Sequence, residues 1–293
     1  MNLISSIADL ASFHSCACVP TMGALHKGHL ALVHRAAQFN KPVVVSIFVN
    51  PTQFAPTEDL SKYPRTLDRD LELLRAANVA AVFTPDVETI YPKNNPIPTP
   101  QLPAVATQPR LEDAFRPTHF AGVCQVVARL FDLVKPSIAV FGEKDYQQLR
   151  VISDMIAHEN APSQFSQSSV SAAKSPARNG GERWPDLKII AHPTIRDTDG
   201  LAMSSRNIYL TPEQRPQALG LSRALQHART HDSPAAAEEA MARMLTEHHL
   251  AIDYAVVRDA RTLMPISDFD RPARAIIAAR LPTVRLIDNA AIH

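Results

Sequence analysis

The chain has 293 residues, of which 45% are hydrophobic and 20% are charged, and its formal net charge is +1. A chain of this size can bury a sizeable core, and we expect two domains. The near balance of charge excludes nucleic acid and anionic membranes as main partners, so any basic site must be local. The chain lacks an export signal at its start and an apolar run of membrane-spanning length, and its three cysteines predict buried, reduced thiols. We therefore expect a cytoplasmic protein.

The first expected strand, residues 16–19, is followed by a loop with two glycines and two histidines and then by an apparent helix. Gly23 and Gly28 let the backbone approach a ligand closely, and the positive end of the helix dipole faces the loop. His26 and His29 stand three residues apart, so their ring donors would point at the same place. These features predict a phosphate site whose imidazoles stabilise the charge that develops on a phosphorus centre under attack.

Other interpretations of this loop remain open. The spacing between Gly23 and Gly28 fits the first half of a Walker A loop, but His29 and Leu30 stand where that motif requires Lys and Ser or Thr. The two histidines could ligate a metal, although no nearby Asp, Glu or Cys completes such a site. They could also simply cap the helix.

Strand-like and helix-like segments alternate through the first two thirds of the chain. The expected strands cover residues 16–19, 43–49, 79–84, 137–141 and 187–191, and the expected helices cover residues 30–39, 67–77, 123–134 and 147–158. This alternation predicts an α/β fold with a doubly wound parallel sheet, in which ligands bind beyond the carboxyl ends of the strands.

Residues 160–184 interrupt this pattern. They are rich in Ser, Gln, Ala, Gly and Pro and contain few large apolar side chains, so we expect a disordered insertion. Lys174, Arg178 and Arg183 could form a polyanion site within it, although scattered bases in a solvated loop are common.

The character of the chain changes again after residue 196, where we place a domain boundary. Residues 1–196 would form the nucleotide-binding domain, and residues 197–293 a smaller α+β domain that closes over the site as a lid. Residues 199–207 lie at the junction and suit a mobile phosphate-binding loop.

The smaller domain is expected to begin with two helices and to end with short strands. Thr211 would cap the first helix, with Pro212 at its first position. The expected helices extend to residue 231 and over residues 235–249, and the expected strands cover residues 252–257, 275–279 and 284–287.

Several segments resemble a known family. His26-Lys-Gly-His29 resembles the HxGH signature of the Rossmann-like nucleotidyltransferases that transfer adenylyl groups, and residues 20–30 resemble one family among them, the pantoate–β-alanine ligases. Further segments that resemble this family occur in the family's order at residues 43–54, 63–66, 116–122, 141–148, 199–207 and 285–289. The resemblance implies a two-step reaction. Pantoate attacks the α-phosphorus of ATP to give pantoyl adenylate and pyrophosphate, and the amine of β-alanine then displaces AMP to give pantothenate.

The resemblance also implies catalytic and ATP-binding residues. His26 and His29 would stabilise charge on the phosphates, and Lys144 would add a fixed positive charge. Hydroxyl donors and a guanidinium for the β- and γ-phosphates would come from Ser204, Ser205 and Arg206. The complete expected ATP-binding set is Met22, Gly142, Glu143, Lys144, Asp145, Met203, Ser204, Ser205 and Arg206.

The pantoate-binding residues that the resemblance implies are Asn50, Gln53, Gln148, Tyr63, Arg116 and His119. The three amides could orient a carboxylate without neutralising it, so that the nucleophile stays reactive. Tyr63, Arg116 and His119 could instead have a packing role. Mg²⁺ is expected on the ATP phosphates, held mainly by phosphate and water, so no metal-binding residue is assigned.

Three other functions remain open at this point. An adenylyl transferase with a phosphorylated nucleophile would need a cationic pocket where this chain offers amides. An NAD-dependent oxidoreductase would need a GxGxxG fingerprint, which is missing. A regulator that binds nucleotide without catalysis would be expected to lose His26, His29 or Lys144. Members of the resembled family are usually homodimers, and a homodimer is expected here.

Overall fold

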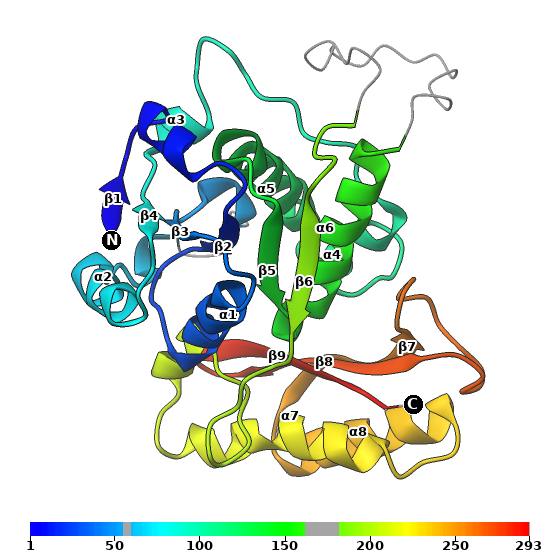
Figure 1. Ribbon diagram of the computed structural model, residues 1–293. Coiled ribbons are helices and arrows are strands. Elements are labelled where there is room, and N and C mark those ends of the chain that lie inside the picture. Colours follow the sequence, from blue (N-terminus) through cyan, green and yellow to red (C-terminus); the bar gives the residue numbers. More distant parts are fainter. Residues whose placement is uncertain (55–59, 162–181, 293) are drawn as a thin grey trace.

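The computed structural model describes residues 1–54, 60–161 and 182–292. Within these residues the chain forms a six-stranded parallel sheet in the order β1-β4-β3-β2-β5-β6 and a three-stranded antiparallel sheet in the order β7-β8-β9 (Figure 1). The predicted α/β fold, with a doubly wound parallel sheet and a smaller C-terminal α+β part, is therefore confirmed. Nowhere in the described residues is a helix both long and apolar enough to cross a bilayer.

The elements of the parallel-sheet region follow the predicted alternation. The strands are β1 (Asn2–Ile4), β2 (Ala17–Thr21), β3 (Val43–Ile47), β4 (Ala81–Phe83), β5 (Ile138–Gly142) and β6 (Lys188–His192). The α-helices are α1 (Lys27–Ala37), α2 (Leu67–Ala76), α3 (Val87–Ile90), α4 (Glu112–Phe115), α5 (His119–Val134) and α6 (Tyr146–Glu159). The 3-10 segments are η1 (Ala8–Phe13), η2 (Pro51–Gln53), η3 (Leu60–Lys62), η4 (Ala104–Ala106), η5 (Glu143–Asp145) and η6 (Ser205–Tyr209). Strand β1, which pairs with β4 at one edge of the sheet, is an element that the sequence pattern does not indicate.

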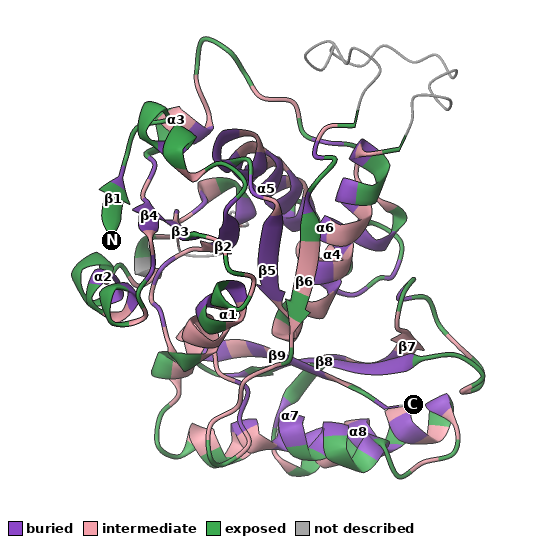
Figure 2. Cartoon of the chain, in the orientation of Figure 1, coloured by how far each residue is buried: buried purple, intermediate pink, exposed green. Residues whose placement is uncertain are grey.

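Helices cover both faces of the parallel sheet, as the central strand β2 and the residue before it illustrate. Cys16 and Cys18 belong to the cluster that includes the apolar sides of α5 and α6, whereas Ala17 and Val19 belong to the cluster that includes α1 and α2. All four residues are fully buried, and Figure 2 shows the same burial along β5 and α5. Burial on both faces explains why the strands read as continuous apolar runs. Cys16, Cys18 and Cys124 are free and buried, as predicted.

The C-terminal part packs two helices against one face of its antiparallel sheet. It consists of α7 (Gln214–Ala228), α8 (Pro234–Glu247), β7 (Ala251–Asp259), β8 (Ala273–Leu281) and β9 (Val284–Ala291). Leu225, Met241 and Ile277 belong to a separate hydrophobic cluster between these helices and the sheet. Tyr254 and Ile276 instead join the cluster of the parallel-sheet region. The separate cluster supports the predicted boundary near residue 196, and both this boundary and the closure of this part as a lid stay predictions.

Helix α7 begins later than its sequence indicates. The regular helix starts at Gln214, because Pro216 has no N–H to donate to the Pro212 carbonyl, but the Thr211 carbonyl already accepts a helical hydrogen bond from the Arg215 amide (3.0 Å). Thr211 Oγ1 accepts a hydrogen bond from the Gln214 amide (3.3 Å), and Gln214 Oε1 accepts one from the Thr211 amide (3.2 Å). This reciprocal pair is a capping box, so Thr211 caps the chain's entry into α7 as predicted, although the regular helix begins three residues later.

A buried ion pair fastens the C-terminal sheet to α4. Arg285 of β9 contacts both carboxylate oxygens of Glu112, at 2.6 and 2.9 Å, and the Tyr254 hydroxyl donates to the same carboxylate at 2.7 Å. Burial by itself would raise the pKa of Glu112, but the hydrogen bonds and charge of Arg285 lower it overall. Glu112 therefore stays ionised inside the protein, where its paired guanidinium compensates the burial.

The ends of the predicted insertion at residues 160–184 are ordered, which corrects the prediction there. Asn160 Nδ2 donates to the Trp184 carbonyl (2.8 Å), and the Trp184 amide donates to Asn160 Oδ1 (2.9 Å). The Trp184 ring is buried against Phe131, with 5.7 Å between the ring centroids. These contacts hold the two ends together, and residues 162–181 lie outside the described residues.

Arg183 is bound by carboxylates and does not offer a free charge to a polyanion. Its guanidinium contacts Asp132 at 2.5 and 3.1 Å and Glu159 at 3.1 Å. The proposed polyanion site therefore loses one of its three bases, and the other two, Lys174 and Arg178, lie outside the described residues.

Candidate active site

A pocket opens at the carboxyl ends of β2, β3 and β5, which is where the doubly wound sheet predicts a ligand. Its walls come from the β2–α1 loop, η2, α5, the β5–α6 turn and the segment that follows β6. The predicted site residues in its lining are Met22, His26, His29, Gln53, Tyr63, Arg116, His119, Gly142, Lys144, Asp145, Gln148, Met203, Ser204, Ser205 and Arg206. Asn50 and Glu143 are the two predicted residues that do not line it.

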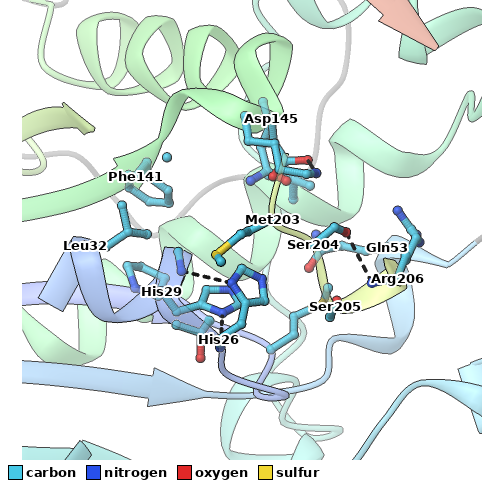
Figure 3. Close-up of a pocket in the computed structure, with 18 of the residues that line it drawn as sticks. His26, His29, Leu32, Gln53, Phe141, Asp145, Met203, Ser204, Ser205 and Arg206 are labelled. Carbon is cyan, nitrogen blue, oxygen red and sulfur yellow. Dashed lines mark hydrogen bonds and ion pairs between the residues drawn. The ribbon is translucent and has the colours of Figure 1, made fainter. Parts of the chain in front are cut away.

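The two histidines of the β2–α1 loop interlock at the start of α1. His26 is the N-cap residue, and its Nδ1 accepts a hydrogen bond from the Gly28 amide at 3.1 Å. His29 Nδ1 accepts one from the His26 amide at 3.3 Å, so the two side chains form a capping box. The ring centroids are 4.1 Å apart, and Figure 3 shows both rings beside Met203.

These hydrogen bonds determine which nitrogen of each imidazole carries the proton. Because each Nδ1 accepts from a backbone N–H, a neutral ring must carry its proton on Nε2. Burial, together with the charge of Lys144, lowers the pKa of His26 from 6.5 to about 4. Burial and the neighbouring His26 lower the pKa of His29 to about 3. Both rings are therefore neutral at pH 7, and each can offer one Nε2–H donor to a ligand.

Gly28 leaves the space that the folded-back ring of His26 requires. A Cβ atom at this position would lie 2.8 Å from His26 Cε1 and 2.9 Å from His26 Nδ1. Real Cβ contacts are longer than this, so any larger residue would displace the ring. The glycine between the two histidines is thus explained by the capping geometry.

Asp70 holds the loop that leads into α1, and the sequence reasoning missed it. Its two carboxylate oxygens accept hydrogen bonds from the amides of Ala24 (2.9 Å) and Leu25 (2.8 Å), and Thr66 Oγ1 donates to it at 3.2 Å. Gly23 and Ala24 have positive φ angles of 79° and 51°, so this loop needs external support. In the sequence, Asp70 stands out because it is a carboxylate on the apolar side of the amphipathic helix α2. In the structure it is 1% exposed.

Asn50 lies beside Gln53 but does not line the pocket, and its contact with pantoate stays a prediction. Its Oδ1 accepts from the Tyr91 hydroxyl (2.7 Å) and from the hydroxyl and amide of Thr52 (3.1 and 3.4 Å). Its Nδ2 donates to Gln53 Oε1 (3.0 Å) and to the Gly122 carbonyl (3.2 Å). The residue is 1% exposed, and its contact with Oε1 orients the Gln53 side chain.

Gln53 is held on both its side chain and its backbone. Asn50 occupies its Oε1, which leaves the Nε2 group as the part that can donate into the pocket. The Gln53 carbonyl accepts from Arg116 Nη2 (3.2 Å) and from His119 Nδ1 (3.1 Å). Because His119 Nδ1 donates to a carbonyl, its Nε2 accepts from Arg116 Nη1, 3.3 Å away. Arg116 and His119 therefore line the pocket and also fix Gln53.

The β5–α6 turn brings Lys144 and Asp145 into the pocket. Lys144 Nζ lies 3.5 Å from Asp145 Oδ1. Burial by itself would raise the pKa of Asp145, but the charges of Lys144 and Arg206 lower it overall, so this carboxyl is ionised. Glu143 is turned away, because its carboxylate pairs with Arg274 of β8 at 2.8 Å. This ion pair explains why the predicted Glu143 side chain is absent from the lining.

The segment after β6 supplies the hydroxyl and guanidinium side chains. Ser204 Oγ accepts a hydrogen bond from the Arg206 amide (3.2 Å) and caps η6. Ser205 hydrogen-bonds Tyr63, whose pKa is raised by burial despite the opposing effects of Ser205 and Arg206. Figure 3 shows Ser204, Ser205 and Arg206 together on one side of the pocket.

The fold and the pocket define a class of enzyme. A doubly wound sheet presents two neutral imidazoles at a helix start, and Lys144 and Arg206 reach the same pocket from separate elements. This is the arrangement of an HxGH nucleotidyltransferase, in which positive charge and N–H donors converge on the phosphates of a nucleotide.

Comparisons with known proteins narrow the class to one family. A family model described as pantoate–β-alanine ligase matches residues 2–175 and 183–291. A pantothenate synthetase from Rhodopseudomonas palustris (strain HaA2) is 45% identical over 282 residues, which cover 94% of this chain and 90% of that protein. A crystal structure of pantothenate synthetase from Thermus thermophilus superposes with a TM-score of 0.86 at 41% identity, over the full length of both chains. A pantoate–β-alanine ligase structure from Francisella tularensis gives a TM-score of 0.75 at 30% identity, over 99% of this chain and 97% of that one.

The chain belongs to the pantoate–β-alanine ligase family. It is therefore a carbon–nitrogen ligase that joins pantoate to β-alanine at the expense of ATP. Membership of this family excludes two alternative functions that the sequence left open, an NAD-dependent oxidoreductase and a regulator without catalysis.

Proposed function

We propose that the pocket carries out both half-reactions of this ligation. In the first, a carboxylate oxygen of pantoate attacks the α-phosphorus of ATP, and the bond to pyrophosphate breaks. In the second, the amine of β-alanine attacks the carbonyl carbon of pantoyl adenylate, AMP leaves, and the amine loses a proton. The Francisella tularensis relative is described in complex with an ATP compound and β-alanine, which supports the same substrates here.

The two neutral imidazoles carry this proposal. Their Nδ1 atoms are occupied by backbone amides, so their Nε2–H groups are preset as donors. Donors that are already oriented stabilise the charge developing on phosphate oxygens without reorganising during the reaction. Because both pKa values lie far below 7, His26 and His29 serve as hydrogen-bond donors and not as general acids at neutral pH.

The positive charges in the pocket bind the triphosphate. Lys144 is fixed in the β5–α6 turn, and Arg206 lies on the segment that follows β6. Asp145 and the backbone of Gly142 contact the ribose, and Met22 and Met203 border the nucleotide. The hydroxyls of Ser204 and Ser205 donate to phosphate oxygens next to Arg206. These contacts are assigned from the family resemblance and from the positions of the residues in the pocket lining.

Amide groups orient pantoate for attack. Gln53 offers its Nε2 group, and Gln148 lines the pocket with a side-chain amide that makes no hydrogen bond to any described residue. Neither group carries a charge, so pantoate keeps a reactive carboxylate. Arg116 and His119 maintain the position of Gln53, and Tyr63 closes the same end of the pocket.

Mg²⁺ enters the site with the ATP phosphates. Among the lining residues Asp145 is the one carboxylate, and no cluster of three metal-ligating side chains occurs in the described part of the chain. This donor set suits an ion held by phosphate oxygens and water, which is the usual binding mode of Mg²⁺ at nucleotides. The ion supplies positive charge at the triphosphate. A cytoplasmic homodimer completes the proposal, following the family resemblance.

The test is the dependence of AMP formation on each substrate. Purified protein should release AMP and form pantothenate only when pantoate, ATP and β-alanine are all present. Labelled pyrophosphate should exchange into ATP with pantoate alone, because the first half-reaction is complete without the amine. Pantothenate formation without any exchange would contradict the adenylate intermediate.

A further inference from the structure

The backbone of the turn that carries Lys144 is bound by an asparagine of the C-terminal sheet. Asn289 of β9 donates through Nδ2 to the backbone oxygens of Glu143 (2.9 Å) and Lys144 (2.7 Å). Asn289 is 3% exposed and lies 145 residues after Lys144 in the chain. A strand of the other sheet therefore binds the backbone of the charged residue in the pocket.

Asn289 is itself locked by its neighbours. Its Oδ1 accepts from Arg274 Nε at 2.6 Å, and Arg274 Nη2 reaches the carboxylate of Glu143 at 2.8 Å. The Arg274 guanidinium also lies 3.7 Å above the ring of Tyr146, directly after the turn. Both donors and the acceptor of the amide are thus in use, and its orientation is fixed.

The preceding residue of β9 holds the other phosphate-facing segment. Asp288, which is 2% exposed, forms a two-point ion pair with Arg196 at 2.7 and 2.9 Å. Arg196 also donates to the Gly200 carbonyl (3.1 Å) and pairs with Ala202 in an isolated bridge. This bridge lies at the base of the loop that ends in Ser204. Two adjacent residues of one strand therefore fasten the turn with Lys144 and the loop with Ser204.

We propose that Asn289 is a positioning residue that acts through Lys144. It sets the place of the Lys144 ammonium relative to the imidazoles of His26 and His29 by fixing the turn from the opposite sheet. A fixed charge stabilises a transition state only while it stays where the charge develops, and supporting residues must hold it within a fraction of an ångström. The proposal rests on the role given above to Lys144.

A merely structural amide would behave differently. Replacing such an amide would lower the stability of the fold and leave the reaction rate of each folded molecule unchanged. Asn160 provides a matched control, because its side chain also bridges two backbone groups of a distant residue, Trp184, and lies outside the pocket lining. Asn160→Ala should lower the melting temperature without changing the exchange rate per folded molecule.

The first test is Asn289→Asp, measured as pantoate-dependent exchange of pyrophosphate into ATP per folded molecule. The new side chain keeps an oxygen for Arg274 but replaces the amide donors with an oxygen that repels the carbonyls of Glu143 and Lys144. We expect the rate to fall roughly 10-fold or more, with an unchanged KM for pantoate. Asn289→Ala serves as a second variant if the first does not fold. An unchanged rate in a folded variant would overturn the proposal.

The second test combines this change with Lys144→Ala. If Asn289 acts through Lys144, Asn289→Asp should change the rate of the Lys144→Ala enzyme less than about two-fold, because the group it positions is gone. If the rate of the double variant instead falls by the product of the two single losses, Asn289 acts independently of Lys144, and the proposal is overturned. Where exchange in Lys144→Ala is too slow to measure, the same cycle is read from the Kd of ATP. A normal rate in Lys144→Ala alone would instead refute the role of Lys144, which separates the two failures.

Discussion

His26 Nδ1 and the backbone amide of Gly28 are joined by a hydrogen bond of 3.1 Å that folds the imidazole back over the first turn of α1. The same contact leaves 2.8 Å between the ring and the place of a Cβ atom at residue 28. The orientation of the His26 ring and the absence of a side chain two residues later are therefore one structural requirement.

Gly28→Ala should separate activity from stability. Alanine stabilises a helix by about 1 kcal/mol relative to glycine, so the intrinsic effect on the fold is favourable. The added methyl group, however, must push the His26 ring from its cap position, and we expect turnover to fall roughly 10-fold or more. Thermal unfolding and AMP release measured on the same preparation check this. Lys27→Ala, at an exposed neighbouring position, is the control and should leave both properties nearly unchanged. Full activity in Gly28→Ala would show that the cap geometry is dispensable.

His29→Ala should slow the adenylation step roughly 100-fold or more and leave the fold intact. The reason is the loss of a preset Nε2–H donor. Exchange of pyrophosphate into ATP reports this step, and circular dichroism reports the fold. A folded variant with nearly normal exchange would remove His29 from the mechanism.

The low pKa of His29 predicts a specific pH dependence of stability. In the unfolded chain this imidazole binds a proton near pH 6.5, whereas in the folded protein it resists protonation down to about pH 3. The unfolded state therefore binds more protons between these values, and the free energy of unfolding must decrease as the pH falls through this window. Denaturant unfolding of the wild type and of His29→Gln at several pH values tests this. The variant should lose less stability on acidification, and equal slopes would contradict a ring that stays neutral in the folded protein.

Gln53→Ala should impair the use of pantoate far more than the use of ATP. Its Nε2 group is the part of the side chain left for the substrate, so the KM for pantoate should rise roughly 10-fold or more while that for ATP changes less than about two-fold. Initial rates with each substrate varied in turn provide the measurement. Gln125→Ala is a suitable control, because Gln125 also makes an amide contact, to the Ile97 carbonyl, and lies outside the pocket lining. Equal losses for both substrates would indicate that Gln53 only packs.

Residues 162–181 should be replaceable by a short Gly/Ser linker with little loss of activity or melting temperature. The closure entropy of a connection changes only slowly with its length, and no predicted site residue lies in this segment. Trp184→Ala is the opposite case, since it removes a buried ring next to Phe131 and should cost about 3–5 kcal/mol of stability. Activity assays and thermal unfolding of both proteins distinguish them. A large loss from the linker replacement would place a functional contact inside it.

Local features of the site could be predicted from the sequence because their causes are local. The interlocked rings of His26 and His29 depend on residues within three positions of one another, and the alternation of strands and helices places their loop at the edge of the sheet. Features that depend on distant partners could not be predicted. Asp70 supports a loop 45 residues earlier, and Asn289 supports a turn 145 residues earlier.

Two adjacent glutamines also show what the sequence alone cannot predict. Gln148 lines the pocket, whereas Gln147 is buried and bonds to the Glu112 amide and to the carbonyl of Val105. Which of two neighbouring amides faces the substrate depends on how α6 is rotated against η4 and α4, and packing decides that rotation. Asn50 is a related case, because only the three-dimensional turn reveals that its amide already bonds to Gln53, Gly122 and Tyr91.

The ion pair between Glu112 and Arg285 has a consequence for synthesis of the chain. The two residues are 173 positions apart, and a ribosome makes the carboxylate long before the guanidinium. Until the last strand has emerged, burying Glu112 would leave it without the two-point contact to Arg285, with Arg116 Nη1, 3.7 Å away, as its ion-pair partner, so its burial would be less well compensated than in the complete protein. Helix α4 should therefore reach its native packing only near the end of translation, and a nascent chain stalled before residue 285 should remain sensitive to proteases around residue 112.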